Sequence, residues 1–529
     1  MNKKKIVASI ALSALMLTSM VPTVSLAGNV NSLDDSKIHE VGSIEKNGDR
    51  RGFRYQNADI LKPVMGKTKG MGLPSTYNLA LRNESTKVKN QGAYGTCWTF
   101  GAISSLESGL IKAGNATSDI DLSEHHLAYF GYKGSNSGVK STYAGKDTML
   151  TYVDDDIYMI GGSRIISVPA LARWYGAVDE QDAPYTEELK DLSTSLSTKS
   201  TIKLEDADYL PEPITKVGKK KKVALDKAAT EIMKRYIMDK GALSAGYYAT
   251  SEDKQFEGKD PFFNDTKNTQ YCNENITANH EVSIVGWDDN MKKEDFKTAK
   301  GKIPEGDGAW IVKNSWGEDF GDKGYFYMSY YDANIVEPTF FDGEKVKYEG
   351  SNTKHAKNTI YQYDGVGAGD ASLIYEKRVK GANIFTARSD EKINSAGTYT
   401  IGANSTVNVS VYLNPSKTSP EKGKLLLKKS FKEEFAGYHT LEFDTTLDIP
   451  KGSKFSVIVE SYYMENGKKM YSLPFEVKNV RYDINNYVKL DYSKGQSAVL
   501  TGSKWVDVKS MKNVQKDYKM GNATIKLFG

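Results

Sequence analysis

Cysteine is scarce in this chain, which has only two, Cys97 and Cys272, among its 529 residues. Two cysteines cannot supply the several bridges of a disulfide-stabilised scaffold, although an exported protein could form one bridge. Zinc held by both cysteines and a histidine would require closer ligand spacing than these residues have, so we predict no metal site here. The two thiols are therefore available for other chemistry.

Long hydrophobic runs are also scarce after the first twenty residues. A basic stretch at residues 1–5 precedes an apolar stretch at residues 6–20, and small residues end at Ala27. This order predicts a secretory signal peptide at residues 1–27. No later stretch approaches the roughly 20 apolar residues of a membrane span. We therefore expect a secreted protein, extracellular or at the cell surface, without a membrane span.

Excess charge of one sign is missing as well. The formal net charge is +4 at pH 7, which is too small to indicate a nucleic-acid partner. The richness in lysine, asparagine and tyrosine, with little proline or cysteine, favours a Gram-positive bacterium as the source. A run of lysines at residues 219–222 could contact anionic wall polymers, but a solvated loop is the favoured explanation.

Three separated segments supply the groups of a thiol-dependent acyl-transfer site. Residues 90–100 read NQGAYGTCWTF, residues 279–287 read NHEVSIVGW and residues 310–317 read WIVKNSWG. Apolar residues recur at helical spacing just after Cys97, so we expect this cysteine at a helix N-terminus, where the helix dipole favours a thiolate. His280 could then pair with the thiolate and later protonate the leaving amine.

The remaining members of these segments fit supporting roles. The side-chain carbonyl of Asn314 could fix one tautomer of the imidazole, and Trp316 could shield that hydrogen bond from water. The Gln91 amide could donate to the tetrahedral oxyanion together with the Cys97 backbone N–H. Each motif alone is more often structural, but their joint occurrence in this order favours catalysis.

These motifs resemble those of the papain family of cysteine proteases, from about Leu73 to Tyr331. The resemblance implies an α+β fold of two lobes, one helical and one β-rich, with the site in the cleft between them. Residues 122–127, LSEHHL, are similar to a helix-opening stretch of that family. Gly161 and Gly162 are similar to the glycine pair that binds the extended substrate backbone, with an ordinary turn as the alternative.

Two departures from the family pattern carry further expectations. His280 and Asn314 lie farther from Cys97 than the roughly 130–150 residues of simple papain-like chains. We therefore expect surface insertions in the polar stretches 133–156 and 187–227. Glu281 replaces an alanine that helps to line the pocket for the second substrate residue before the cut. A carboxylate is costly to bury unpaired, so it should either meet a lysine or arginine of the substrate or pair within the protein.

The pattern changes to alternating strands after residue 354, for example at residues 407–413 and 454–460. Such strands predict an antiparallel, jelly-roll-like β-sandwich. Its start and its AGYHTL strand at residues 436–441 resemble the lectin-like domain of clostridial surface-layer-processing proteases. That resemblance implies a possible structural calcium and a cell-wall polysaccharide as partner. The domains are predicted as signal peptide 1–27, propeptide 28–72, papain-like peptidase 73–346, linker 347–357 and lectin-like β-sandwich 358–529.

The leading interpretation is a secreted cysteine endopeptidase made as a zymogen, requiring no cofactor and acting on protein or peptide substrates. Cell-surface or surface-layer proteins are candidate substrates. Two alternatives stay open. A thiol-dependent transpeptidase would use the same acyl-enzyme, and a carbohydrate-binding adhesive protein would keep the peptidase domain as a scaffold.

Overall fold

A computed structural model describes residues 37–40, 72–133, 148–151, 156–217, 222–250, 260–346, 359–367, 371–375, 377–478, 486–490, 492–511 and 519–529. The predicted signal peptide and linker lie outside these residues, and only residues 37–40 and 72 of the predicted propeptide are described. Within the described residues, no helix is long and apolar enough to cross a membrane.

One long helix and two short, serine-capped helices form the first lobe. They are α3 (Cys97–Lys112), α4 (Glu124–Tyr132) and α5 (Arg164–Ala172). Ser123 caps α4 by accepting from the His126 N–H at 3.0 Å, as expected for a serine at this position. The side chain of Ser163 caps α5 in the same way. The interior of α3 is buried from its first residue through Leu110, so this helix is the core of the lobe.

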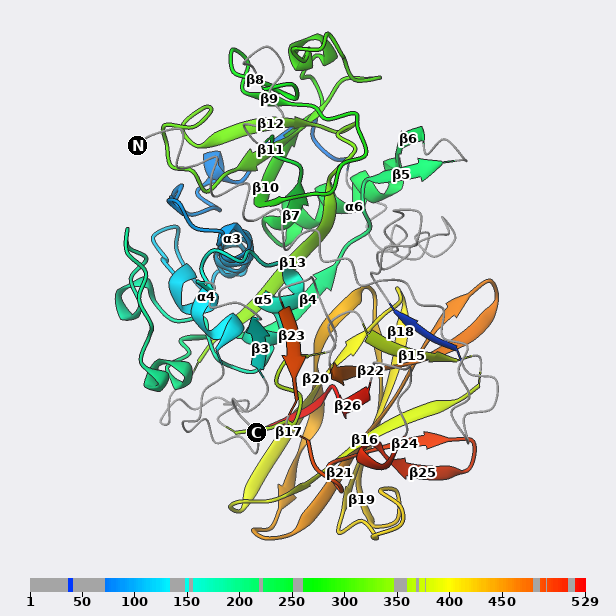
Figure 1. The fold of residues 1–529 in the computed structure, drawn as a ribbon. Helices are drawn as coiled ribbons and strands as arrows, with labels where there is room; N and C mark the ends of the chain where they lie inside the picture. Colours follow the sequence, from blue (N-terminus) through cyan, green and yellow to red (C-terminus); the bar gives the residue numbers. More distant parts are fainter. Residues whose placement is uncertain are drawn as a thin grey trace.

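A mostly antiparallel sheet forms the second lobe. Its strands are β2 (Thr76–Asn78), β7 (Leu243–Tyr247), β8 (Phe263–Asn264), β9 (Thr269–Gln270), β10 (His280–Asp288), β11 (Ala309–Lys313), β12 (Tyr325–Ser329), β13 (Val336–Lys345) and β4 (Ile202–Tyr209). Helix α6 (Lys227–Asp239), capped by Asp226, packs against β7 and β10. The strands run in the order β4-β13-β7-β10-β11-β12-β9-β8, with β2 paired to β10 (Figure 1).

The C-terminal residues form a β-sandwich. One of its sheets contains β14 (Ile360–Tyr361), β27 (Ile525–Phe528), β17 (Glu391–Thr400) and β20 (Ala436–Ile449). The other contains β1 (Lys37–Glu40), β15 (Ala371–Tyr375), β16 (Val379–Thr386), β18 (Ser405–Leu413), β19 (Lys424–Glu433), β21 (Lys454–Glu465), β22 (Lys468–Lys478), β24 (Ser497–Thr501), β25 (Lys504–Asp507) and β26 (Lys519–Ala523). The predicted α+β class, a papain-like fold followed by a β-rich domain, is confirmed.

Small elements complete the chain. They are the pairs β5 (Ile214–Val217) with β6 (Lys222–Leu225) and β3 (Thr148–Thr151) with β23 (Asn486–Lys489), and the 3-10 helices η1 (Ala80–Arg82), η2 (Glu180–Asp182), η3 (Thr194–Thr198), η5 (Lys293–Phe296) and η6 (Val508–Ser510). Because β4 lies inside the main sheet, the interpretation of residues 187–227 as a surface insertion is wrong for that strand.

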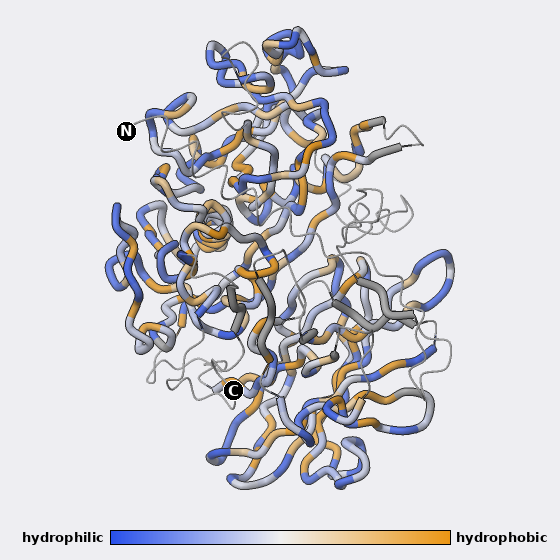
Figure 2. Tube along the Cα trace, viewed as in Figure 1, coloured by the Kyte–Doolittle hydropathy of each residue, from blue (hydrophilic) through white to orange (hydrophobic). Residues whose placement is uncertain are grey.

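The two domains share one sheet, which the sequence did not indicate. Strand β20 of the sandwich pairs antiparallel with β4 of the peptidase lobe (Figure 1). Gly437 permits this contact, because a Cβ there would lie 1.9 Å from the Ala207 carbonyl oxygen. Trp174 also stacks on Phe528 with ring centroids 4.7 Å apart. Hydrophobic segments follow α3 and the sandwich strands, whereas outer loops are hydrophilic (Figure 2). The domains are therefore joined by buried surface as well as by the chain.

Candidate active site

Cys97 is the first residue of α3, as the sequence predicts. Its thiol is fully buried, and burial raises its pKa to about 12, while the backbone N–H groups of Glu281, Trp98 and Cys97 itself lower it. These donors and the helix dipole would stabilise a thiolate once a proton acceptor is present. The Glu281 contact also places β10, which begins at His280, beside the thiol.

The imidazole of His280 is held from one side. Its Nε2 lies 2.8 Å from Asn314 Oδ1, and its ring stacks on Trp316 with centroids 4.6 Å apart. Burial lowers the His280 pKa to about 4, and the Asn314 hydrogen bond opposes that shift. Within the described part of the chain, Nδ1 has no hydrogen-bond partner. Nδ1 is therefore the nitrogen left to accept a proton from a thiol.

Burial of both groups favours the neutral thiol and the neutral imidazole when each is considered alone. Transfer of one proton between them creates two opposite charges together, and their attraction is strong in a buried site of low dielectric. The pair is thus suited to ionise jointly rather than one group at a time.

Gln91 is fixed by the segment that carries the orienting asparagine. Its Oε1 accepts from the Ser315 hydroxyl at 2.6 Å, and its Nε2 donates to the Tyr94 carbonyl at 2.7 Å. The backbone N–H of Gln91 also donates to the Ser315 carbonyl at 2.8 Å. Since a side-chain amide has two N–H groups, one remains for an oxyanion.

The glycine pair lies against the start of α3. A Cβ on Gly162 would lie 2.5 Å from the Trp98 ring, and a Cβ on Gly95 would lie 3.2 Å from the Gly161 nitrogen. Gly161 has φ +91°, which disfavours other residues, and its carbonyl accepts from Tyr132 at 2.8 Å. The structure thus brings both glycines next to Cys97, where a substrate backbone could approach.

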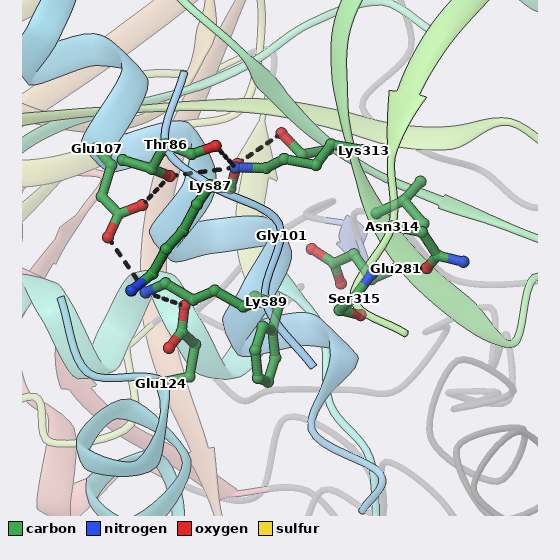
Figure 3. Close-up of a pocket in the computed structure, with 14 residues that line it drawn as sticks. Thr86, Lys87, Lys89, Gly101, Glu107, Glu124, Glu281, Lys313, Asn314 and Ser315 are labelled. Atoms are coloured by element: carbon green, nitrogen blue, oxygen red, sulfur yellow. Dashed lines mark hydrogen bonds and ion pairs between the residues drawn. The ribbon is translucent and has the colours of Figure 1, made fainter. Parts of the chain in front are cut away.

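Glu281 points into the protein (Figure 3). Its carboxyl accepts a hydrogen bond from the Ser244 hydroxyl and is only 4% exposed. Burial raises the Glu281 pKa to about 8, with a smaller contribution from Glu337, while Ser244 and Arg164 lower it. The carboxyl also lines a cavity of about 20 Å³, which is room for one water molecule. Ser244 is therefore a partner within the protein, which is the second of the two alternatives that the sequence left open for the Glu281 carboxylate.

A buried ionic cluster behind the site was missed by sequence reasoning. Lys89 Nζ lies 2.9 Å from Glu124, 3.4 Å from Glu107 and 2.7 Å from Asp121. Glu107 also accepts from Thr86, to which Lys313 Nζ donates at 3.2 Å, as Figure 3 shows. Lys313 directly precedes Asn314, so this cluster helps to fix the strand end that presents the asparagine. Single charged residues in a sequence give no signal for such a cluster.

Tyr185 was also missed as a supporting residue. Its hydroxyl donates to the Gln91 carbonyl at 2.9 Å and lies 2.6 Å from Thr96 Oγ1. It therefore ties the loop that carries Gln91 to the residue before Cys97. A single tyrosine in a sequence gives no signal for such a contact.

A metal ion has no evident place among the described residues. They contain no group of three or more His, Cys, Asp or Glu side chains that could hold one. The possible calcium of the C-terminal domain therefore lacks a fitting ligand set here and stays a prediction. Both cysteines are free and buried.

Comparison with known proteins assigns both domains. The papain family cysteine protease profile matches residues 73–147 and 160–337, and the lectin-like domain profile matches residues 360–528. Cysteine proteinase 1 of Entamoeba histolytica is 24% identical over 309 residues, which cover 58% of this chain and 75% of that protein. Cathepsin S of Bos taurus is 26% identical over 260 residues, which cover 49% of this chain and 60% of that protein.

Two solved structures of the cysteine protease Cwp84, one after propeptide cleavage, share this fold. Cwp84 is described as a surface layer associated protein of Clostridium difficile. The structure of its cysteine protease and lectin-like domains matches with a TM-score of 0.66 at 23% identity, covering 94% of this chain and 99% of that one. The cleaved form matches with a TM-score of 0.64 at 24% identity, covering 86% of this chain and 99% of that one. The chain carries a papain family cysteine protease domain followed by a lectin-like domain, and it is a papain-like cysteine peptidase.

Proposed function

We propose that this peptidase is secreted as a zymogen and cleaves proteins internally through Cys97, His280, Asn314 and Gln91. The observation that carries the proposal is the bond between His280 Nε2 and Asn314 Oδ1, which leaves Nδ1 for a thiol at the N-terminus of α3. This arrangement supplies a base whose orientation is fixed.

The chemistry follows from the positions of these atoms. His280 Nδ1 takes the Cys97 proton, and the thiolate sulfur attacks the scissile carbonyl carbon. The resulting oxyanion accepts hydrogen bonds from the Gln91 amide and the Cys97 N–H. The imidazolium protonates the amine as the C–N bond breaks, leaving a thioester. Water, deprotonated by His280, then hydrolyses the thioester and restores the thiol.

The choice between a peptidase and a transpeptidase depends on this last step. An amine that attacked the thioester in place of water would form a new amide. The hydrolytic reading is preferred because the curated relatives named above are proteinases. An adhesive protein with a silent peptidase domain is disfavoured because the four proposed catalytic residues are all present.

The similar proteins and the second domain support a place of action for the enzyme. The likeness to a surface layer associated protease supports surface proteins as substrates and export as its route. The lectin-like domain supports a polysaccharide of the cell wall as a second partner. Strand β1 of the propeptide pairs with β15 of the sandwich, so part of the propeptide could be held on that domain while the rest occupies the cleft.

Replacing Cys97 by alanine should abolish proteolysis. Loss of the nucleophile of such a unit lowers turnover by up to about 10⁶-fold. The variant should also accumulate uncleaved, because processing between Lys67 and Leu73 would be autocatalytic. Cleavage of a fluorogenic peptide and N-terminal sequencing measure the two effects.

A thiol-directed epoxide provides the matched control. It should label Cys97, which has His280 as a proposed base, and spare Cys272, whose thiol donates to the Glu274 carbonyl at 3.5 Å. Full activity of the alanine variant, or labelling of Cys272 alone, would refute the mechanism.

Gln91→Ala should lower kcat far more than it raises KM. Loss of one oxyanion donor costs about 10²–10³ in turnover, because the donor acts mainly in the transition state. Asn314→Ala should also slow turnover by releasing the imidazole from its orientation. Steady-state kinetics check both variants, with circular dichroism to show that each is folded. Unchanged kcat in both would remove these residues from the mechanism.

We also propose that Glu281 favours lysine or arginine at the second substrate residue before the cut. A carboxyl with a pKa of about 8 is mostly neutral at pH 7 and charged at pH 9, so the preference should grow as the pH rises. The ratio of kcat/KM for lysine over leucine substrates should therefore increase from pH 7 to pH 9. In Glu281→Gln, which can still accept from Ser244, the ratio should be lower and independent of pH. Equal ratios in both proteins would confine Glu281 to its internal bond.

A further inference from the structure

A buried histidine lies at the seam where the lectin-like domain joins the peptidase sheet. His439 of β20 is 2% exposed and is the register partner of Asp206 on β4. Its Nδ1 lies 3.3 Å from Asp206, 3.6 Å from Glu433 and 4.0 Å from Asp208. Three carboxylates from both domains thus converge on one ring nitrogen.

The hydrogen bonds around the ring are all satisfied when both nitrogens carry a proton. Nδ1 faces carboxylate oxygens, which accept only. Nε2 lies 3.0 Å from the Thr400 hydroxyl oxygen, whose own hydrogen is donated to the Phe435 carbonyl at 3.1 Å. Both ring nitrogens can donate only in the imidazolium form. The geometry therefore suits a cation at this position, with Thr400 donating to Phe435.

The charges around the ring favour the same state. Burial opposes a charge on His439, but the carboxylates of Asp206, Glu433 and Asp208 outweigh it and raise the pKa of the ring from 6.5 to about 9. Burial raises the Asp208 pKa to about 7, and His439 opposes that shift. Without the cation, the seam would hold three partly buried carboxylates without this counter-charge, which is costly.

The neighbouring elements add few other charges. From α6, the Tyr236 hydroxyl donates to Asp208 at 3.0 Å. From β13, Asp342 is the register partner of Asp206 and adds one more carboxyl, whose pKa burial and Asp206 raise and Lys240 lowers. Lys240 lies at the C-terminal end of α6. His439 is therefore the cation that the converging carboxylates face directly.

We propose that protonated His439 is an electrostatic lock that fastens the lectin-like domain to the catalytic sheet and releases it when the proton is lost. The sheet order β20-β4-β13-β7-β10 connects this lock to the strand that begins with His280. The strand pairing that attaches the lectin-like domain thus belongs to the same sheet as the pairings that support His280. This inference concerns the fold and does not depend on the proposed substrates.

The direction of the pH dependence follows from the raised pKa. A group whose folded pKa exceeds its ordinary value stabilises the folded state fully below about pH 6.5, and that stability is lost as the pH rises through about 9. The lock should therefore hold at neutral pH and weaken in alkaline solution.

Hydrogen exchange on the full chain in the Cys97→Ala background tests the lock. In His439→Gln at pH 7.5, amides of β4 and β20 should exchange at least tenfold faster than in the parent, while those of β11 and β12 change less. Acidification to pH 5.5 should reduce the difference, because the Asp208 carboxyl, whose pKa is about 7, then gains a proton. Adding Asp206→Asn and Glu433→Gln should restore slow exchange at pH 7.5. If the ring has a purely structural role, neither acidification nor the two added substitutions should restore slow exchange.

A matched control comes from an exposed ion pair that also reaches β20. Lys392 Nζ lies 2.8 Å from Asp448, and both side chains are more than 70% exposed, so Lys392→Gln should leave exchange unchanged. If His439→Gln does not fold, Glu433→Gln provides a second test. Loss of this carboxylate should lower the pKa of His439, so thermal stability should be lost at a lower alkaline pH than in the parent. Exchange and pH profiles equal to those of the parent in every variant would overturn the proposal.

Discussion

The close approach of α3 to the central sheet is the constraint on which the candidate site depends. A Cβ on Gly101 would lie 2.6 Å from Ser244 Oγ and 3.2 Å from the Glu281 side chain. A Cβ on Gly109 would lie 3.1 Å from the Phe340 ring. Gly101 and Gly109, about two helical turns apart, thus let the helix backbone pack close against the strands. This packing places Cys97, at the start of the helix, beside the beginning of β10, where the Glu281 backbone N–H reaches the thiol.

This close packing explains why polar groups behind the site are so strongly paired. Burial lowers the pKa of Lys313 to about 8, with Glu107 opposing the shift, and burial raises the pKa of Glu124 to about 8, with Lys89 opposing it. An unpaired charge at either position would be costly. Lys313 Nζ donates to the carbonyl and the hydroxyl of Thr86, and Glu124 accepts from Lys89. The same bonds fix the loop before Cys97 and the strand before Asn314. Electrostatic pairing here therefore also sets catalytic geometry.

Sequence motifs predicted the fold class and the members of the site because those residues stand in short contiguous segments. Residues that act through distant contacts gave no comparable signal. Tyr185 reaches Gln91 across the fold, and Lys89 meets Glu107 and Glu124 only after α3 and α4 have packed. The orientation of Glu281 was undecided in the sequence because strand alternation does not reveal whether Ser244 lies within reach.

The shared sheet could not be predicted for a related reason. Period-two patterns identify strands but not their partners, and an edge strand of one domain looks the same as an internal strand of a larger sheet. Strand β4 would leave one side of its backbone unpaired if the sandwich were absent, and β20 covers that edge. The carboxylates of Asp206 and Asp208 lie on that covered strand, and His439 from the other domain supplies a direct counter-charge to both. The peptidase lobe is thus completed, in hydrogen bonds and in charge, by the domain that follows it.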